Sequence, residues 1–262
     1  MSFLTLDTVS HYYFARHSYT KILDNITFSV KEGEFVTLLG PSGCGKSTLL
    51  SMIAGTVKPT EGNIHLCNKS LEEHNITIGW LLEKDYLFPW KTVIDNMLVI
   101  RQKEIKENAL TLLEKTGLSS SYNHYPSTLP AGTRQCIAFL RALLCNPDII
   151  LLDDPFSKLD YQTKLKLEEM VIHLLHSHQQ TAVFATNDID EAIALSDRIV
   201  LLNSDVGSIT KIFEVPLELR QEVPLLARQH PKYQLLFDKI WQEMNKNQTR
   251  SVNKVVRSRH DL

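Results

Sequence analysis

The sequence predicts an α/β fold with a parallel-sheet core, an antiparallel β subdomain and an inserted helical lobe. Short, nearly continuous apolar runs at 149–152 and 181–185 indicate parallel strands, because such strands are buried on both faces. The helical pattern from 161 to 178 provides the crossover between them. Apolar and polar residues alternate at 4–6 and 26–30, which is typical of antiparallel strands.

The remaining elements follow from the same patterns. A turn at 31–34 leads into a strand at 35–39, and another strand follows at 63–66. An amphipathic helical stretch is expected at 96–118, a further strand at 198–202, and a turn followed by helices at 216–244. A chain of 262 residues can bury one substantial core and still carry a smaller lobe.

Composition excludes several classes of protein. The formal net charge is -2, so no nucleic-acid partner is expected. The four cysteines lack metal-ligand spacing and suit a reducing compartment: Cys44, Cys67, Cys136 and Cys145. The N-terminus has no basic region before an apolar core, and no apolar stretch approaches the roughly 20 residues of a spanning helix. We therefore expect a cytoplasmic protein that is at most peripheral to a membrane.

A glycine-rich loop follows the apolar strand at 35–39. Its nine residues match the phosphate-binding P-loop: Gly40, Pro41, Ser42, Gly43, Cys44, Gly45, Lys46, Ser47 and Thr48. The glycines let backbone N–H groups turn toward phosphates, Lys46 places a cation beside the β/γ oxygens, and the Ser47 hydroxyl can bind Mg²⁺. The helical pattern that follows adds a favourable dipole. A chance match is disfavoured by this strand-loop-helix context, so we expect a nucleoside triphosphate to bind.

Two carboxylates, Asp153 and Asp154, follow the apolar strand at 149–152. Asp153 is placed to hold Mg²⁺ through water, and Asp154 is placed to orient an attacking water molecule. The segment 129–135 lies between the P-loop and these carboxylates, and a helical pattern follows it.

With these motifs in this order, the chain resembles the ABC ATPases, which are P-loop NTPases. The resemblance reaches to about residue 202 and rests on an LSGGQ-type signature at 129–133, ahead of the strand that carries Asp153. It implies that Tyr13 stacks on adenine, although Tyr12 could be the stacking ring and Tyr13 an ordinary strand residue. Segment 157–160 resembles the D-loop of the family, and Asn187 lies in the segment that resembles the switch histidine.

The segment 87–90 looks most like the nitrate/sulfonate/taurine importer ATPases, although a plain turn with a buried indole remains an alternative. The resemblance implies ATP and Mg²⁺ as ligands, with Ser47, Asp153 and Glu83 near the metal. It also implies a head-to-tail homodimer or heterodimer, in which Pro130, Ala131 and Gly132 meet the partner's nucleotide. Integral membrane permease subunits at the cytoplasmic face would be direct partners, and a solute-binding protein would act indirectly.

These patterns and the resemblance together set the expected boundaries. The ABC ATPase domain covers 1–215, with its helical lobe at about 86–140. A C-terminal helical extension covers 216–245, and a basic, flexible tail covers 246–262. For this tail, a solvated terminus is favoured over contact with anionic lipid.

The chain departs from the family at positions used for chemistry. Glu83 stands where a Q-loop glutamine is expected, and its carboxylate adds negative charge beside the triphosphate. Asp154 replaces the usual glutamate and is one methylene shorter, and a displacement of ~1 Å can cost ~10²-fold in rate. Asn187 replaces the switch histidine; its amide can still donate to a γ-phosphate but carries no charge.

The signature is altered as well. Pro130 removes a hydroxyl and a backbone donor where serine would meet the partner's γ-phosphate, which can forfeit a hydrogen bond of ~1.5–3 kcal/mol. Ala131 adds a methyl group, whereas Gly132 keeps the second glycine of the motif. In a head-to-tail dimer these departures would affect both nucleotide sites.

Two functions therefore compete. The first is the ATP-binding subunit of an importer, with Asp154 as a slow water-orienting base. The second is a nucleotide-gated, largely non-hydrolytic subunit that binds ATP through its intact P-loop. A third class, the soluble ABC ATPases of translation and repair, is disfavoured because neither a second cassette nor a coiled-coil or zinc insertion is present. The sequence leaves the solute and the direction of transport open.

Overall fold

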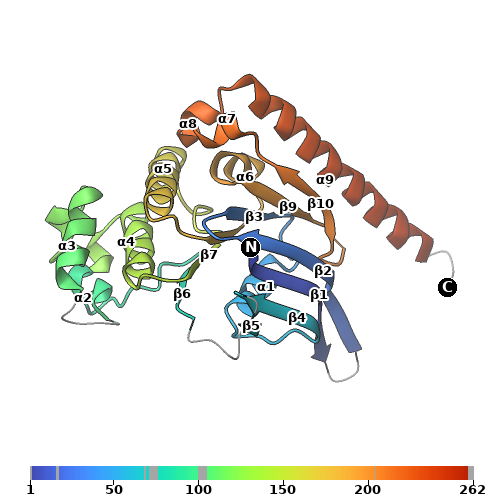
Figure 1. The fold of residues 1–262 in the computed structure, drawn as a ribbon, viewed down its shortest axis with the longest axis horizontal. Helices are drawn as coiled ribbons and strands as arrows, with labels where there is room; N and C mark the ends of the chain where they lie inside the picture. Colours follow the sequence, from blue (N-terminus) through green and yellow to red (C-terminus); the bar gives the residue numbers. More distant parts are fainter. Residues whose placement is uncertain are drawn as a thin grey trace. The chain divides into compact units, whose positions relative to one another are not determined.

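The computed structural model of the protein describes residues 2–15, 18–67, 69–70, 76–99, 105–203 and 205–258. The chain forms two compact units (Figure 1). The first consists of residues 1–74 and 183–262, and the second consists of residues 75–182. Among the described residues, no helix combines the length and the apolar character needed to cross a membrane.

An antiparallel sheet forms one layer of the first unit (Figure 1). Its strands, in spatial order, are β2 (Ser18–Lys31), β1 (Ser2–Ala15), β4 (Glu61–Leu66) and β5 (Lys69–Ser70). Leu4 lies opposite Val30, and both side chains are fully buried. The antiparallel strands predicted from the alternation at 4–6 and 26–30 are therefore confirmed, and they pair with each other.

The first unit also contains strands with more continuous burial. In spatial order they are β10 (Ile209–Glu214), β9 (Arg198–Leu202), β3 (Phe35–Leu39) and β8 (Ala182–Thr186). The first residue of β8, Ala182, is assigned to the second unit. β3 and β9 are parallel, and β10 adds an antiparallel edge. Every residue of β3 and β8 is buried, as the apolar runs predicted.

The described part of the first unit also contains the α-helices α1 (Lys46–Ile53), α6 (Ile189–Leu195), α7 (Leu217–Arg220), α8 (Pro224–Ala227) and α9 (Pro231–Ser258). One hydrophobic cluster joins β3, β9 and β10 to α6, α7 and α9. From α9 it contains Tyr233, Leu236 and Ile240, which are all buried. The predicted terminal helices are thus confirmed, and the backbone of α9 stays helical into the segment expected to be a tail.

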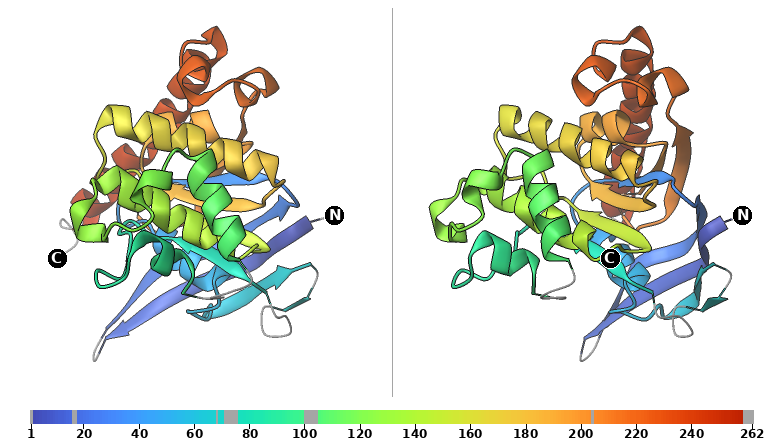
Figure 2. Two further views of the ribbon diagram at one scale, coloured as in Figure 1. Left: turned by 90° about the vertical axis from the view of Figure 1, so that its left-hand side faces the viewer. Right: turned by 60° about the vertical axis from the view of Figure 1, so that its left-hand side comes forward.

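The second unit combines two parallel strands with helices. The strands are β6 (Ile78–Leu81) and β7 (Ile149–Asp153). The α-helices are α2 (Val93–Met97), α3 (Lys106–Lys115), α4 (Ala131–Leu144) and α5 (Tyr161–Ser177), and short 3₁₀ turns lie at Ser119–Ser121 and Pro126–Thr128. α4 contacts α2, α3 and α5, and the green segments of Figure 2 gather around it. α5 confirms the predicted crossover helix.

The helical pattern expected at 96–118 is wrong as a continuous stretch. α2 already ends at Met97, and α3 begins at Lys106; residues 100–104 lie outside the described part. Asn96 is fully buried, and its side-chain amide donates to the carbonyls of Phe88, Lys91 and Thr92. This polar network ties α2 to the preceding loop, a constraint that the apolar periodicity does not reveal.

The packing of α9 gives a stability prediction. Ile240→Ala removes a fully buried side chain from the cluster, so we expect the free energy of unfolding to fall by about 2–4 kcal/mol. Leu235→Ala in the same helix is the matched control, because Leu235 is 62% exposed, and it should change stability by less than about 0.5 kcal/mol. Urea titrations followed by circular dichroism measure both values. Equal effects would show that α9 does not dock as described.

Candidate functional site

The glycine-rich loop 40–48 connects β3 to α1 in the first unit. Gly43 and Gly45 have positive φ angles of 83° and 96°, and Gly45 caps α1. The Lys46 ammonium donates to the carbonyls of Gly40 at 2.7 Å and Pro41 at 3.0 Å. The Lys46 ammonium is therefore bound to two neutral carbonyls of its own loop. Phosphate oxygens would bind this cation more strongly than neutral carbonyls do.

The close packing around Gly45 explains why the loop needs a glycine there. An added Cβ atom would lie 2.7 Å from Leu23 Cδ2 and 3.1 Å from Ile22 Cγ2. Nothing lies within 4 Å of the corresponding position at Gly43. Cys44 is buried, and burial raises the pKa of its thiol despite the nearby Lys46 charge. Cys44 is therefore a neutral packing residue.

Two adjacent tyrosines of β1 have different neighbours. The Tyr13 hydroxyl lies 3.5 Å from the Thr48 hydroxyl, and its ring meets His11 edge-on. The Tyr12 ring instead contacts Tyr19, and Lys21 lies 5.2 Å from its centre. Tyr13 is 50% exposed. The structure thus brings Tyr13, rather than Tyr12, to the phosphate-binding loop with an accessible ring.

Asn187 is exposed directly after β8 and lies in the same unit as the loop. The Gly40 N–H donates to the Thr186 carbonyl at 3.4 Å, which links the loop to the residue before Asn187. Asp188 caps α6, because its side chain accepts from the N–H groups of Asp190 and Glu191. The position of Asn187 is therefore fixed on both sides by hydrogen bonds of its neighbours.

The paired carboxylates lie in the second unit. Asp153 is the last residue of β7, and both Asp153 and Asp154 are partly buried. Asp154 has a φ of 47°, in the left-handed region that aspartate adopts more readily than most residues. The backbone here thus favours the shorter acid that the sequence carries.

Glu83 forms an ion pair that the sequence did not predict. Its carboxylate lies 2.9 Å from the Lys158 ammonium, and the two side chains are 50% and 56% exposed. Lys158 belongs to the D-loop-like segment 157–160. An exposed pair of this kind adds little to stability, but it offsets the charge that glutamate introduces in place of glutamine.

Three side chains of α4 hold the segment around Glu83. The Gln135 amide donates to the Leu82 carbonyl at 2.9 Å, and Arg134 donates to the Asp85 carboxylate at 3.0 Å. Arg141 donates to the backbone carbonyls of Asp85 and Tyr86, each at 3.1 Å. The sequence pattern indicated these α4 residues only as part of the helix that follows the signature. Their polar side chains at 134, 135 and 141 were the available signal.

The altered signature residues begin α4. Pro130 is the N-cap residue, and Pro130 and Ala131 are exposed. Gly132 is buried, and an added methyl group would overlap the side chain of Thr163 in α5. The exposed pair is therefore available to a partner, whereas Gly132 serves helix packing within this chain.

The second unit also contains a cavity of about 320 Å³ beside these residues. Its lining residues are Glu83, Lys84, Asp85, Tyr86, Ala131, Arg134, Gln135, Pro155, Lys158 and Leu159. The cavity thus collects the Q-loop-like segment, the start of α4 and the D-loop-like segment of one unit. Asp153, Asp154 and Pro130 are in this unit but do not line it.

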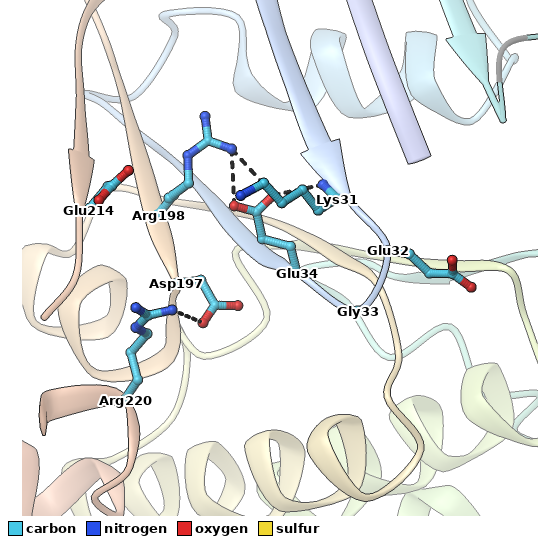
Figure 3. A pocket seen from close by; sticks show the side chains of 8 residues that line it. All are labelled: Lys31, Glu32, Gly33, Glu34, Asp197, Arg198, Glu214 and Arg220. Carbon is cyan, nitrogen blue, oxygen red and sulfur yellow. Dashed lines mark hydrogen bonds and ion pairs between the residues drawn. The ribbon is translucent and has the colours of Figure 1, made fainter. Parts of the chain in front are cut away.

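A polar cavity of about 290 Å³ in the first unit has a structural explanation (Figure 3). Arg198 bonds Glu34 at 3.0 Å, and Arg220 bonds Asp197 at 2.9 Å. The Asp197 carboxylate also accepts from the Phe35 N–H at 2.8 Å. The Arg198–Glu34 pair and the Phe35–Asp197 hydrogen bond join the entrance of β3 to the start of β9, and the Arg220–Asp197 pair adds α7.

Comparison with known proteins settles the family. The family model described as ABC transporter matches residues 23–157, which is just over half of the chain. The chain belongs to the ABC transporter ATP-binding proteins. YtlC of Bacillus subtilis (strain 168), named an ABC transporter ATP-binding protein, is 45% identical over 251 residues, covering 94% of this chain and 96% of YtlC. The aliphatic sulfonates import ATP-binding protein SsuB of Bacillus cereus (strain ATCC 10987 / NRS 248) is 37% identical over 214 residues, covering 80% and 85% of the two chains.

Solved structures agree with this assignment. The ATP-binding cassette MJ0796, in a dimeric post-hydrolysis state bound to ADP and Pi, superposes with a TM-score of 0.71 at 31% identity. The match covers 81% of this chain and 99% of that cassette. The predicted ABC ATPase fold is therefore confirmed. This ABC protein belongs to a family that binds and hydrolyses ATP.

The glycines of the loop give a second prediction. Both substitutions place a side chain at a positive φ angle: Gly43→Ala and Gly45→Ala. Gly45→Ala also brings the new methyl group into overlap with Leu23 and Ile22, whereas Gly43→Ala meets no neighbour. We expect Gly43→Ala to cost about 1 kcal/mol of folding free energy and Gly45→Ala at least about 2 kcal/mol. Thermal unfolding without nucleotide measures the difference. The packing argument fails if the two variants are equally stable.

Proposed function

We propose that this chain is the ATP-binding subunit of an importer for solutes of the nitrate, sulfonate and taurine class, with slow ATP hydrolysis. The observation that carries the proposal is the 37% identity over 214 residues to a sulfonate import ATPase. The segment 87–90 supports the same class. By analogy with the dimeric cassette MJ0796, two such subunits, identical or different, would bind head to tail and act with integral membrane permeases at the cytoplasmic face. A solute-binding protein would contribute indirectly.

Loop 40–48 fits a triphosphate. Gly43 and Gly45 adopt the positive φ angles that turn backbone N–H groups toward an anion, and the Lys46 ammonium donates to the neutral carbonyls of Gly40 and Pro41. Tyr13 offers an accessible ring near Thr48 for adenine. We assign Ser42 and the other loop residues to phosphate binding on this basis.

The oxygen donors Ser47 and Asp153 suit magnesium, which prefers carboxylates, hydroxyls and phosphates. Magnesium held by such donors would neutralise charge on the triphosphate. Asp154 would orient the attacking water, and the Asn187 amide would donate to the γ-phosphate. Glu83 would lie near the metal and water, with its charge offset by Lys158. Pro130 and Ala131 would meet the nucleotide of the second subunit.

A nucleotide-gated subunit with little hydrolysis is the second candidate. The exposed proline at the start of α4 favours it, because Pro130 has neither the hydroxyl nor the N–H that a signature serine would offer the partner's nucleotide. Both candidates bind ATP and close as dimers. They differ only in turnover.

Reconstitution tests the proposal. The chain would be assembled with a candidate permease in vesicles, and ATP hydrolysis measured with and without a binding protein loaded with a sulfonate. The proposal predicts solute-stimulated hydrolysis that Lys46→Ala abolishes. Stable assembly with tight ATP binding but no hydrolysis would favour the nucleotide-gated subunit instead.

Restoring the family's residues should raise turnover. The double variant Asp154→Glu and Asn187→His extends the water-orienting acid and adds a group that can carry charge, so we expect kcat to rise about tenfold or more. Steady-state phosphate release measures it. The melting temperature serves as the control, because glutamate at the positive φ of position 154 can add strain. If the double variant folds normally and its kcat does not rise, Asp154 and Asn187 are not the cause of slow hydrolysis.

The Glu83–Lys158 pair predicts a charge effect on nucleotide affinity. Lys158→Met leaves Glu83 uncompensated, so Mg-ATP binding should weaken about fivefold. Adding Glu83→Gln to that variant should bring the dissociation constant back to within about twofold of wild type. Lys84→Met is the matched control, because Lys84 lines the same cavity and removes the same charge. Calorimetric titration measures all four proteins, and equal losses in both lysine variants would show that the pair has no special role.

A further inference from the structure

The C-terminal helix α9 packs on α6, the helix that starts two residues after Asn187. Tyr233 of α9 is 5% exposed and shares a hydrophobic cluster with Ile189 and Ile193 of α6. α9 lies outside residues 23–157, which the family model matches. A part of the chain beyond the matched cassette segment thus contacts the start of α6.

Tyr233 adds a polar contact to this packing. Its hydroxyl donates to the side-chain carboxylate of Asp190, in the first turn of α6, and approaches the Asp190 carbonyl at 3.5 Å. Burial and the Asp190 carboxylate both raise the pKa of Tyr233, so the hydroxyl stays protonated and remains a donor. The contact joins residues 43 positions apart in the sequence.

Further hydrogen bonds extend from Asp190 to the phosphate-binding loop. The Asp190 N–H donates to the Asp188 carboxylate at 2.8 Å, and the Asp188 N–H donates to the Thr186 hydroxyl at 3.1 Å. The Thr186 carbonyl accepts from the Gly40 N–H at 3.4 Å. Asn187 lies within this series, between the two residues that make these bonds.

We propose that Tyr233 is a positioning residue that holds the Asn187 segment through Asp190, so that the C-terminal extension sets the rate of ATP hydrolysis. The inference rests on the proposed role of Asn187 at the γ-phosphate. The tyrosine acts through Asp190 and Asp188 and does not touch the nucleotide. The packing of α9 on α6 would thereby affect the position of Asn187.

Tyr233→Phe tests the inference, because it deletes one hydroxyl and keeps the buried ring. We expect kcat to fall about tenfold, with KM for Mg-ATP within about twofold of wild type. In the nucleotide-free chain, amide hydrogen exchange in a peptide covering 186–191 should speed up about five- to tenfold. The single variant Asp190→Asn keeps a carbonyl oxygen that can accept from the Tyr233 hydroxyl. Its kcat and its exchange at 186–191 should therefore stay within about twofold of wild type. Asp190→Ala removes the acceptor and should reproduce the faster exchange.

Phe237→Leu controls for packing, because Phe237 packs against the same cluster. It should lower the melting temperature without changing kcat or exchange at 186–191. In a cycle with Asn187→Ala, the kcat loss of Tyr233→Phe should disappear; a fully additive loss would overturn the inference. Unchanged exchange in Tyr233→Phe would also overturn it. Exchange needs no hydrolysis, so a wild-type chain without ATPase activity would contradict the proposed function while this measurement still decides the role of Tyr233.

Discussion

The backbone geometry of loop 40–48 is the constraint on which the rest of the site depends. An anion can be held there only if successive N–H groups face inward, and Gly45 reaches the necessary positive φ while packing against Leu23 and Ile22. β3 brings the chain to this loop, α1 leaves it, and the Thr186 carbonyl braces it at Gly40. The nucleotide-binding role of the protein follows from a junction that no other residue type at Gly45 could form without strain.

Three residues that depart from the family's motifs have particular local surroundings: Glu83 and Asp154 in the second unit, and Asn187 in the first. Glu83 carries a charge that glutamine would not, and Lys158 lies beside it at 2.9 Å. Asp154 is shorter than glutamate and occupies a left-handed backbone position that suits aspartate. Asn187 sits between hydrogen-bonded neighbours that are tied in turn to Tyr233. Each of these departures is thus accompanied by a local feature that suits the residue present.

Periodicity and motif spacing predicted the fold well, because β1, β2, β3, β9 and α5 each leave a local pattern in the sequence. The break between α2 and α3 was missed, because apolar spacing reveals neither the end of α2 at Met97 nor the hydrogen bonds of the buried Asn96 to the preceding loop. The ion pair of Glu83 with Lys158 and the contact of Tyr233 with Asp190 join distant segments. Only the folded chain brings such partners together. The roles of the candidate site residues stay predictions.

The most direct measurement is a calorimetric titration of the wild-type chain with ATP, in the presence and absence of Mg²⁺, beside Lys46→Ala. We expect saturable binding with one ATP per chain, which is tighter with Mg²⁺ and largely lost when the lysine is removed. Binding that Mg²⁺ weakens, or that survives in Lys46→Ala unchanged, would contradict a phosphate site built by loop 40–48 and its metal ligands.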